Sequence, residues 1–213
     1  MTDPTADQIR SALDKAEALL FDLDGTLIDS SGSTRRAWSA FAVRNGLDPE
    51  EVVASVQGQP SAESSARLAR PGADLEEEAR FVEDFELADT EGIVPLPGAI
   101  AALTSGKKVA IVTSCTDALA EVRINAAGLP WPDVVVTAND INKGKPDPEP
   151  FLLGAKKLGV SPRDCVVFED APAGVESGKA AGALVIALRT THPEETLAEA
   201  DLLVDHLGCV FPD

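Results

Sequence analysis

The chain has 213 residues, 44% of them hydrophobic, which is enough to bury a full globular core and to carry an insertion. It holds 18 Lys and Arg against 36 Asp and Glu, a formal net charge of -18. A surface this acidic repels nucleic-acid phosphates and anionic lipids, so neither nucleic acid nor a membrane is an expected partner. An anionic substrate would need a metal or a lysine to reverse the charge locally.

The cysteines and the N-terminal segment bear on location. Cys115, Cys165 and Cys209 are widely separated and show no disulfide or zinc spacing, which suits a reducing compartment. Residues 1–15 contain no apolar stretch behind positive charge, and nowhere do ~18 consecutive apolar residues occur. We therefore expect a soluble, cytoplasmic protein, with a monomer as the simplest state.

The first predicted elements are a helix and a buried strand. Residues 5–16 have apolar side chains at helical spacing, which predicts an amphipathic helix. Residues 18–21 form a short apolar run that ends at Asp22, as a buried parallel strand would. Gly25 and Thr26 are not typical of a strand, so we expect the strand to end near Asp22 and the chain to turn directly after it.

The next segment is helical throughout. Four helices are predicted between residues 33 and 89, and breaks fall at Asn45-Gly46, Gly58 and Pro71-Gly72. The expected helices span residues 34–44, 49–56, 61–69 and 75–88. We predict that residues 30–92 form an all-helical cap, inserted into a core made of residues 1–29 and 93–213.

Beyond Pro97-Gly98, predicted helices and strands alternate. The helices are expected at 99–105, 117–127, 148–158 and 173–181, and the strands at 108–112, 134–136, 164–168, 183–188 and 202–204. This alternation predicts an α/β fold with a Rossmann-like, doubly wound parallel sheet. In such sheets the functional site lies beyond the carboxyl ends of the strands.

Polar and charged side chains lie just past the ends of four predicted strands. They are Asp22 and Asp24 after the first, Thr113 and Ser114 after the second, Lys145 in the loop after the third, and Glu169 with Asp170 after the fourth. Four carboxylates in one crevice would repel one another unless a cation lay between them. Ligands that offer only oxygen suit Mg²⁺, which is therefore the predicted cofactor.

The same residues suit phosphoryl transfer. Asp22 can attack phosphorus to form an aspartyl phosphate. Asp24, two residues further along an extended chain, points to the same side and can protonate the leaving group and then activate water. Lys145 and Thr113, with Ser114 beside them, can bind the phosphoryl oxygens where charge develops.

Each residue also has a purely structural interpretation. Asp22 and Asp24 could cap a turn, Lys145 could be a solvated loop charge, and the Glu169-Asp170 pair could favour the start of a helix. Their convergence at one sheet edge makes the functional interpretation the stronger one. Other polar residues near these motifs are expected to be structural: Asp29 and Ser30 as helix caps, Cys115 as a packed thiol, and His192 and His206 without a role.

Four short segments occur in a known order. They are Phe21-Asp22-Leu23-Asp24-Gly25-Thr26-Leu27, Thr113, Gly144-Lys145-Pro146 and Glu169-Asp170. In order and spacing they resemble the four motifs of the haloacid dehalogenase superfamily, over residues 18–205. That resemblance implies a Rossmann-like core with a helical cap inserted after the first strand. It also implies Mg²⁺ held by Asp22, the backbone carbonyl of Asp24 and Asp170, with Glu169 in support.

Longer stretches of the sequence resemble one group of enzymes within that superfamily. Residues 136–140, 144–150 and 168–175, with Glu91-Gly92-Ile93 before Leu96-Pro97-Gly98, are similar to the small sugar-phosphate and polyol-phosphate phosphatases. The expected substrate is therefore a small phosphorylated sugar or polyol. Cap residues would select it, and the candidates are Gln57, Gln59, Ser61 and Arg67. Gln59 stands where those relatives often have Lys or Arg.

Three other functions are compatible with parts of this pattern. A β-phosphoglucomutase-like phosphomutase uses the same core, but mutases of this family carry a cap His near Thr34 and a cap Arg near Ser61, which this chain lacks. A 2-haloacid dehalogenase needs neither Asp24 nor a metal cluster. A binding module without catalysis is possible on any fold, but every expected catalytic group is present. Hydrolysis of a phosphomonoester is thus the predicted reaction.

Overall fold

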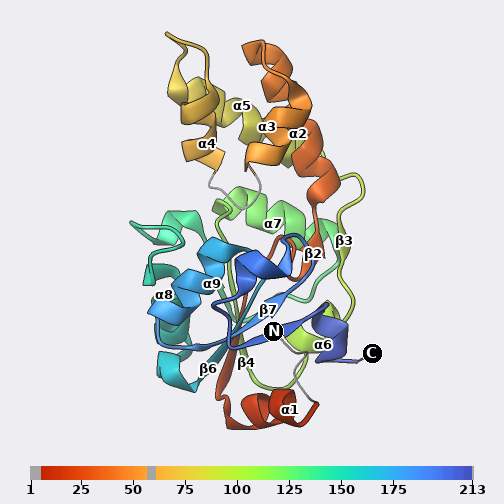
Figure 1. The fold of residues 1–213 in the computed structure, drawn as a ribbon, viewed down its shortest axis with the longest axis vertical. Helices are drawn as coiled ribbons and strands as arrows, with labels where there is room; N and C mark the ends of the chain where they lie inside the picture. The colour runs from red at the N-terminus through yellow and green to blue at the C-terminus, as the bar shows by residue number, and fades with distance from the viewer. Residues whose placement is uncertain (1–5, 57–60, 213) are drawn as a thin grey trace.

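The computed structural model describes residues 6–56 and 61–212. A helical layer stands above an α/β core, and the two are joined by two crossings of the chain (Figure 1). In the described segments no helix is both long and apolar enough to cross a membrane.

The core is built on a six-stranded sheet with the order β5-β4-β1-β6-β7-β8, in which all paired strands are parallel. Its strands are β1 (Ala18–Phe21), β4 (Lys108–Val112), β5 (Val134–Val136), β6 (Cys165–Glu169), β7 (Leu184–Leu188) and β8 (Leu202–Val204). The predicted doubly wound parallel sheet is confirmed. Phe21 pairs with Ile111 on one side and Phe168 on the other, so the residues after these strands reach the same edge together.

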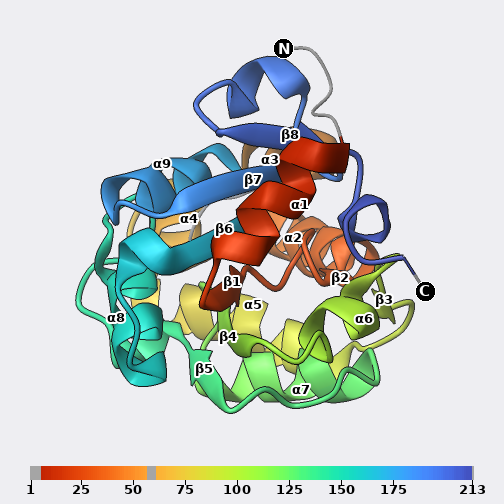
Figure 2. The ribbon, with the colours of Figure 1, turned by 90° about the horizontal axis from the view of Figure 1, so that it is seen from below.

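Helices cover both faces of the sheet, as the continuous apolar strands require. On one face, α8 (Glu149–Leu158) and α9 (Pro172–Ala180) pack on the side chains that include Leu20 and Val167. On the other face, α6 (Ala99–Leu103) and α7 (Asp117–Ala126) pack on Phe21 and Phe168. Helix α1 (Ala6–Lys15) runs beneath the amino ends of the strands (Figure 2).

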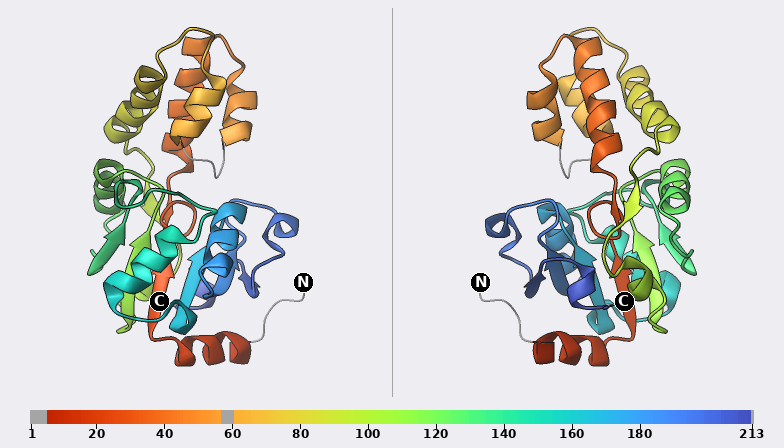
Figure 3. Two further views of the ribbon diagram at one scale, coloured as in Figure 1. Left: turned by 90° about the vertical axis from the view of Figure 1, so that its left-hand side faces the viewer. Right: turned by 90° about the vertical axis from the view of Figure 1, so that its right-hand side faces the viewer.

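The inserted all-helical cap is also confirmed. It consists of α2 (Ser31–Asn45), α3 (Pro49–Val56), α4 (Ser61–Leu68) and α5 (Leu75–Ala88), which stand over the carboxyl edge of the sheet (Figure 3). Trp38, Phe41 and Val82 belong to a hydrophobic cluster separate from the two that flank the sheet. The cap therefore has its own core.

Most differences from the predicted elements are shifts of a few residues. Helix α2 begins at Ser31 rather than Thr34, and β6 extends through Glu169, which pairs with Ala187 of β7. Two short antiparallel strands, β2 (Ile28–Asp29) and β3 (Val94–Pro95), pair where the core joins the cap. They were not predicted, because a strand of two residues is too short to show a periodic pattern of apolar side chains. Short 3₁₀ turns complete the described elements, at Ala138–Asp140, Pro162–Asp164, Glu194–Leu197 and Leu207–Cys209.

Candidate active site

Three carboxylates meet at the carboxyl edge of the sheet. Asp22 comes directly after β1, Glu169 ends β6 and Asp170 is the next residue, and one oxygen from each lies within 4.8 Å of the others. All three residues are buried, with relative exposures of 8% for Asp22, 1% for Glu169 and 3% for Asp170. Strand register explains the meeting, since β1 and β6 are neighbours.

Lys145 lies between two of these carboxylates. Its Nζ donates to Asp22 Oδ1 at 2.5 Å and to Glu169 Oε1 at 2.6 Å, and to the carbonyl oxygen of Val112 at 3.0 Å. Burial opposes the charge of Lys145, but Asp22 and Glu169 outweigh it and raise the pKa of the amine above its ordinary value. The side chain therefore stays an ammonium ion, the local positive charge that an anionic substrate requires.

One lysine does not balance three carboxylates. Burial raises the pKa of Asp22 well above its ordinary 3.8, and Lys145 opposes this while Glu169, Asp170 and Asp24 add to it. Burial, with Glu169, also raises the pKa of Asp170 to about 7, although hydroxyl donors at Thr191 and Thr26 work the other way. A buried oxygen-only cluster with excess negative charge fits a hard divalent cation.

The orientation of Asp170 is set by hydroxyl groups on two loops. Thr26 Oγ1 donates to Oδ1 at 3.1 Å, and Thr191 Oγ1 donates to Oδ2. Gly25 has φ +86°, and a Cβ there would lie 2.3 Å from Asp170 Oδ2. Position 25, in the turn after β1, therefore requires glycine for two reasons: its backbone conformation and the close approach of Asp170.

Glu169 is held by the backbone that comes after it. Its Oε2 accepts the amide N–H groups of Asp170 at 2.9 Å and Ala171 at 3.0 Å. Helix α9 passes so close that a Cβ at Gly174 would lie 1.8 Å from Glu169 Oε1. Only glycine leaves room for the carboxylate in this position.

Asp24 lies outside the carboxylate cluster. Its Oδ1 accepts the hydroxyl of Ser30 at 2.6 Å, and its Oδ2 faces Arg123 Nη1 at 2.9 Å and Cys115 Sγ at 3.1 Å. Ser30 was expected to cap a helix, but it makes no cap hydrogen bond with its side chain, because the hydroxyl is used by Asp24. Ser30 therefore stands at the N-cap position of α2, as expected, but its hydroxyl does not cap the helix.

The cysteine beside Asp24 is a buried thiol, as expected. Burial and the neighbouring Asp24 raise the pKa of Cys115, while Arg123 opposes this. The thiol therefore keeps its proton and can donate it to Asp24.

Arg123 was not predicted as a site residue. It lies on α7 with 5% relative exposure, and its Nη2 pairs with Glu86 Oε1 of α5 at 2.8 Å. A signal was present, because Arg123 comes four residues after Leu119 and three after Ala120, on the apolar face of that helix. A charged residue on a buried face needs a partner.

A cavity of about 580 Å³ lies between the sheet edge and the cap, a size suited to a small metabolite. Its core wall holds all of the predicted core residues: Asp22, Asp24, Thr113, Ser114, Lys145, Glu169 and Asp170. Its cap wall includes Ser61, Glu83 and Glu86, and His192 also lines it although no role was assigned to it.

Two of the other predicted cap residues lie outside the described residues, namely Gln57 and Gln59. Arg67 does not line the cavity, and its guanidinium donates to the carbonyl oxygen of Ser55 at 3.2 Å.

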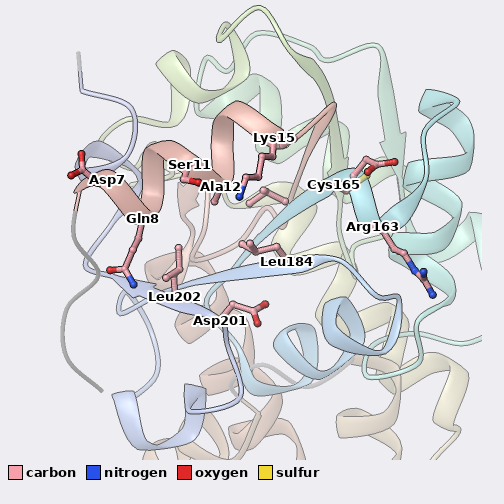
Figure 4. A pocket seen from close by; sticks show the side chains of 13 residues that line it. Asp7, Gln8, Ser11, Ala12, Lys15, Arg163, Cys165, Leu184, Asp201 and Leu202 are labelled. Carbon is pink, nitrogen blue, oxygen red and sulfur yellow. The ribbon is translucent and has the colours of Figure 1, made fainter.

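A second cavity, of about 630 Å³, lies at the opposite end of the sheet, between α1 and the amino ends of the strands (Figure 4). Ser11 and Lys15 line it from α1, and Arg163 and Asp201 from the core. Ligands of parallel α/β sheets bind at the carboxyl ends of the strands. The cavity beneath the cap is therefore the candidate active site.

Comparison with known proteins agrees with this geometry. A family model described as haloacid dehalogenase-like hydrolase matches residues 16–182. The chain belongs to that family, and the resemblance found in its sequence motifs is confirmed. Within the family it is a phosphoric monoester hydrolase.

Proteins similar to this chain include two phosphatases and one phosphomutase. Hexitol phosphatase A of Escherichia coli (strain K12) is 46% identical over 199 residues, covering 91% of this chain and 92% of that protein. Validoxylamine A 7'-phosphate phosphatase of Streptomyces hygroscopicus subsp. limoneus is 38% identical, covering 88% and 92%. A crystal structure of β-phosphoglucomutase from Clostridium difficile has a TM-score of 0.79 at 25% identity, covering 90% of this chain and 92% of that one.

Proposed function

We propose that this protein is a Mg²⁺-dependent phosphatase that hydrolyses a small sugar or polyol phosphate through an aspartyl phosphate on Asp22. The observation that carries the proposal is the buried cluster of Asp22, Glu169 and Asp170 with Lys145 inside it. A nucleophilic carboxylate, a fixed ammonium ion and an oxygen-only cation site are the parts that phosphoryl transfer needs.

Asp22, Asp170 and the backbone carbonyl of Asp24 would hold the cation, with Glu169 in support. When bound, Mg²⁺ neutralises negative charge on the phosphoryl group and on the carboxylates around it. The raised pKa values of Asp22 and Asp170 support a cation at this position, because both carboxylates must be ionised to act and burial alone disfavours that state.

The chain's own residues would carry the remaining steps. Asp22 attacks phosphorus, the ester bond breaks, and Asp24 gives a proton to the departing alkoxide. Asp24 then takes a proton from water as the water attacks the phosphorus of the aspartyl phosphate, which releases phosphate and restores Asp22. Lys145, Thr113 and Ser114 bind phosphoryl oxygens throughout.

Charges around the cavity support a substrate with one phosphate and several hydroxyl groups. The described lining cations already have carboxylate partners: Lys145 with Asp22 and Glu169, Arg123 with Asp24 and Glu86, and Arg35 with Glu50. Since Lys145 would already bind the transferred phosphoryl group, a second phosphate would have to compete with the carboxylates that hold Arg123 and Arg35. Carboxylates such as Glu83 can instead accept hydrogen bonds from hydroxyl groups, as the name of the hexitol phosphatase relative also suggests.

The division of the chain belongs to the same proposal. Residues 30–92 would act as the cap that excludes water from the reaction, and residues 1–29 with 93–213 as the catalytic core. Ser61 would contact substrate, as would Gln57 and Gln59 beyond the described residues. We propose that the enzyme works as a cytoplasmic monomer.

A phosphate-release screen with Mg²⁺ tests the function. The panel should hold sugar, polyol and nucleotide monophosphates, with the Asp22→Asn variant as the control for contaminating phosphatases. We expect the highest kcat/KM with a hexitol, hexose or glycerol monophosphate. A strong preference for nucleotides, or equal release by Asp22→Asn, would contradict the proposal.

A further inference from the structure

Asp24 is held at both of its carboxylate oxygens. Ser30, at the point where the chain enters the cap, donates to Oδ1, and Arg123 on α7 faces Oδ2. Asp24 itself is only half-buried, so neither packing nor lack of space fixes its orientation. Among the described residues, the side chain of Asp24 makes polar contacts with Ser30, Arg123 and the Cys115 thiol.

The guanidinium of Arg123 faces the core with one nitrogen and the cap with the other. Nη1 contacts Asp24 at 2.9 Å and Cys115 Sγ at 3.1 Å. Nη2 contacts Glu86 Oε1 at 2.8 Å and Thr34 Oγ1 at 3.2 Å. Glu86 belongs to α5 and Thr34 to α2, and Thr34 also donates to Glu86 at 3.1 Å.

A planar guanidinium fixes the directions of its two partners relative to each other, which a lysine cannot do. The side chains of Arg123 and Glu86 are 6% and 3% exposed, so both charges of this pair are largely removed from water. The orientation of Asp24 therefore depends on a group whose own orientation depends on two cap helices.

Resting on the proposed function, we propose that Arg123 is the positioning residue for the acid/base Asp24, and that it ties the orientation of Asp24 to the contact between α5 and α7. Glu86 and Thr34 hold Arg123 from the cap side and act through it.

The test is the dependence of kcat/KM on the leaving group. This quantity reports the steps up to the first departure of the leaving group, in which Asp24 acts as an acid. p-Nitrophenyl phosphate has a good leaving group that needs little protonation, whereas phenyl phosphate and alkyl phosphates depend on the acid. A residue that acts through Asp24 should therefore affect the second kind of ester selectively.

For Arg123→Met we expect kcat/KM with phenyl phosphate to fall by on the order of 10²-fold, which is part of the rate enhancement that a general acid supplies. With p-nitrophenyl phosphate we expect a fall of less than about 3-fold, because the departure of p-nitrophenolate needs little protonation. Asp24→Asn should show the same selectivity, and adding Arg123→Met to it should cost little more, because both changes remove one function. Additive losses in the double variant would overturn the proposal.

The matched control is Arg44→Met. Arg44 also pairs with a buried cap glutamate, Glu78 at 3.0 Å, but it does not touch Asp24. We expect it to change both esters equally. An equal loss on both esters in Arg123→Met as well would assign Arg123 to structure alone and overturn the proposal.

Removing Arg123 leaves Glu86 buried without its partner, so that variant can fail to fold. Arg123→Lys and Glu86→Gln then carry the test. Each variant keeps part of the connection between Asp24, Arg123 and Glu86. In each, the kcat/KM for phenyl phosphate divided by that for p-nitrophenyl phosphate should fall by on the order of 10-fold. An unchanged ratio in both overturns the proposal.

Aryl esters also keep this result separate from the substrate assignment. If the wild-type enzyme hydrolyses aryl phosphates but no sugar or polyol phosphate, the proposed substrate is wrong. The ratio between the two aryl esters still decides the role of Arg123.

Discussion

Lys145 and Asp22 form a buried ion pair, with Nζ 2.5 Å from Oδ1 and side-chain exposures of 7% and 11%. The two residues are 123 positions apart in the chain, and the loop before α8 brings the lysine across the carboxyl end of β4, where it also binds the Val112 carbonyl. The proposed nucleophile therefore already lies beside a positive charge, as phosphoryl transfer would require.

Replacing Lys145 tests that arrangement. Lys145→Ala should lower kcat/KM by an amount equivalent to about 2–4 kcal/mol, the usual loss for one preorganised donor in a transition state. Lys143→Ala is the matched control, since Lys143 lies in the same loop with its side chain 73% exposed. The measurement is kcat/KM of both variants with the best substrate. Equal values for the two variants would mean that Lys145 is only a charged residue of the loop.

Mg²⁺ should stabilise the protein more at pH 8 than at pH 5. The pKa of Asp170 is about 7 in the folded protein against an ordinary 3.8. Between these values the folded state holds more protons than the unfolded state, so this group's contribution to stability falls as pH rises. Mg²⁺ needs the ionised carboxylate and removes the repulsion, and its effect on Tm therefore grows with pH.

Thermal melts with Mg²⁺ and with excess chelator, at both pH values, measure this difference. Chelator should also abolish phosphate release. A Mg²⁺ shift in Tm that is equal at the two pH values would contradict a cation at Asp170, and full turnover in chelator would exclude the metal altogether.

Gly174→Ala should damage the site from a helix that contributes no reacting group. The added Cβ would lie 1.8 Å from Glu169 Oε1, so either the carboxylate or α9 must move. Overpacking of this kind costs about 1–3 kcal/mol of stability. We expect a lower Tm and a lower affinity for Mg²⁺ in calorimetric titration. Unchanged values of both would mean that Glu169 can move freely.

The sheet and the residues at its carboxyl edge could be predicted from the sequence. Continuous apolar runs marked all six strands of the sheet, and parallel strands place their carboxyl ends together, so Asp22, Lys145 and Asp170 could be assigned to one edge. Element boundaries were less accurate, as for Glu169, which is the last residue of β6 rather than the first beyond it.

Contacts where the cap meets the core were not predictable. The pair formed by Arg123 and Glu86 joins α7 to α5, and its existence depends on how the cap sits on the core. Ser30 shows the same limit, because a serine before a helix is usually a cap and only the fold brings Asp24 within 2.6 Å of it.

A phosphomutase assay separates the two enzymes that share this core. Thr34, near which the sequence resemblance would place a mutase His, forms hydrogen bonds here with Arg123 and Glu86. We expect β-glucose 1-phosphate with Mg²⁺ and a bisphosphate primer to yield free phosphate and negligible glucose 6-phosphate. Faster accumulation of glucose 6-phosphate than of phosphate would favour the mutase.

The central claim is that phosphate passes through a covalent bond to Asp22, and trapping that intermediate tests it most directly. Asp24→Asn should still be phosphorylated by p-nitrophenyl phosphate, whose leaving group needs little acid, but should hydrolyse the aspartyl phosphate slowly because it lacks the base. Borohydride reduces an acyl phosphate to the alcohol, which converts the modified aspartate to homoserine. Peptide mass spectrometry should find homoserine at position 22 in Asp24→Asn, and none in the Asp22→Asn/Asp24→Asn variant. Homoserine at another position, or phosphate release from the double variant at the rate of the single one, would contradict the account.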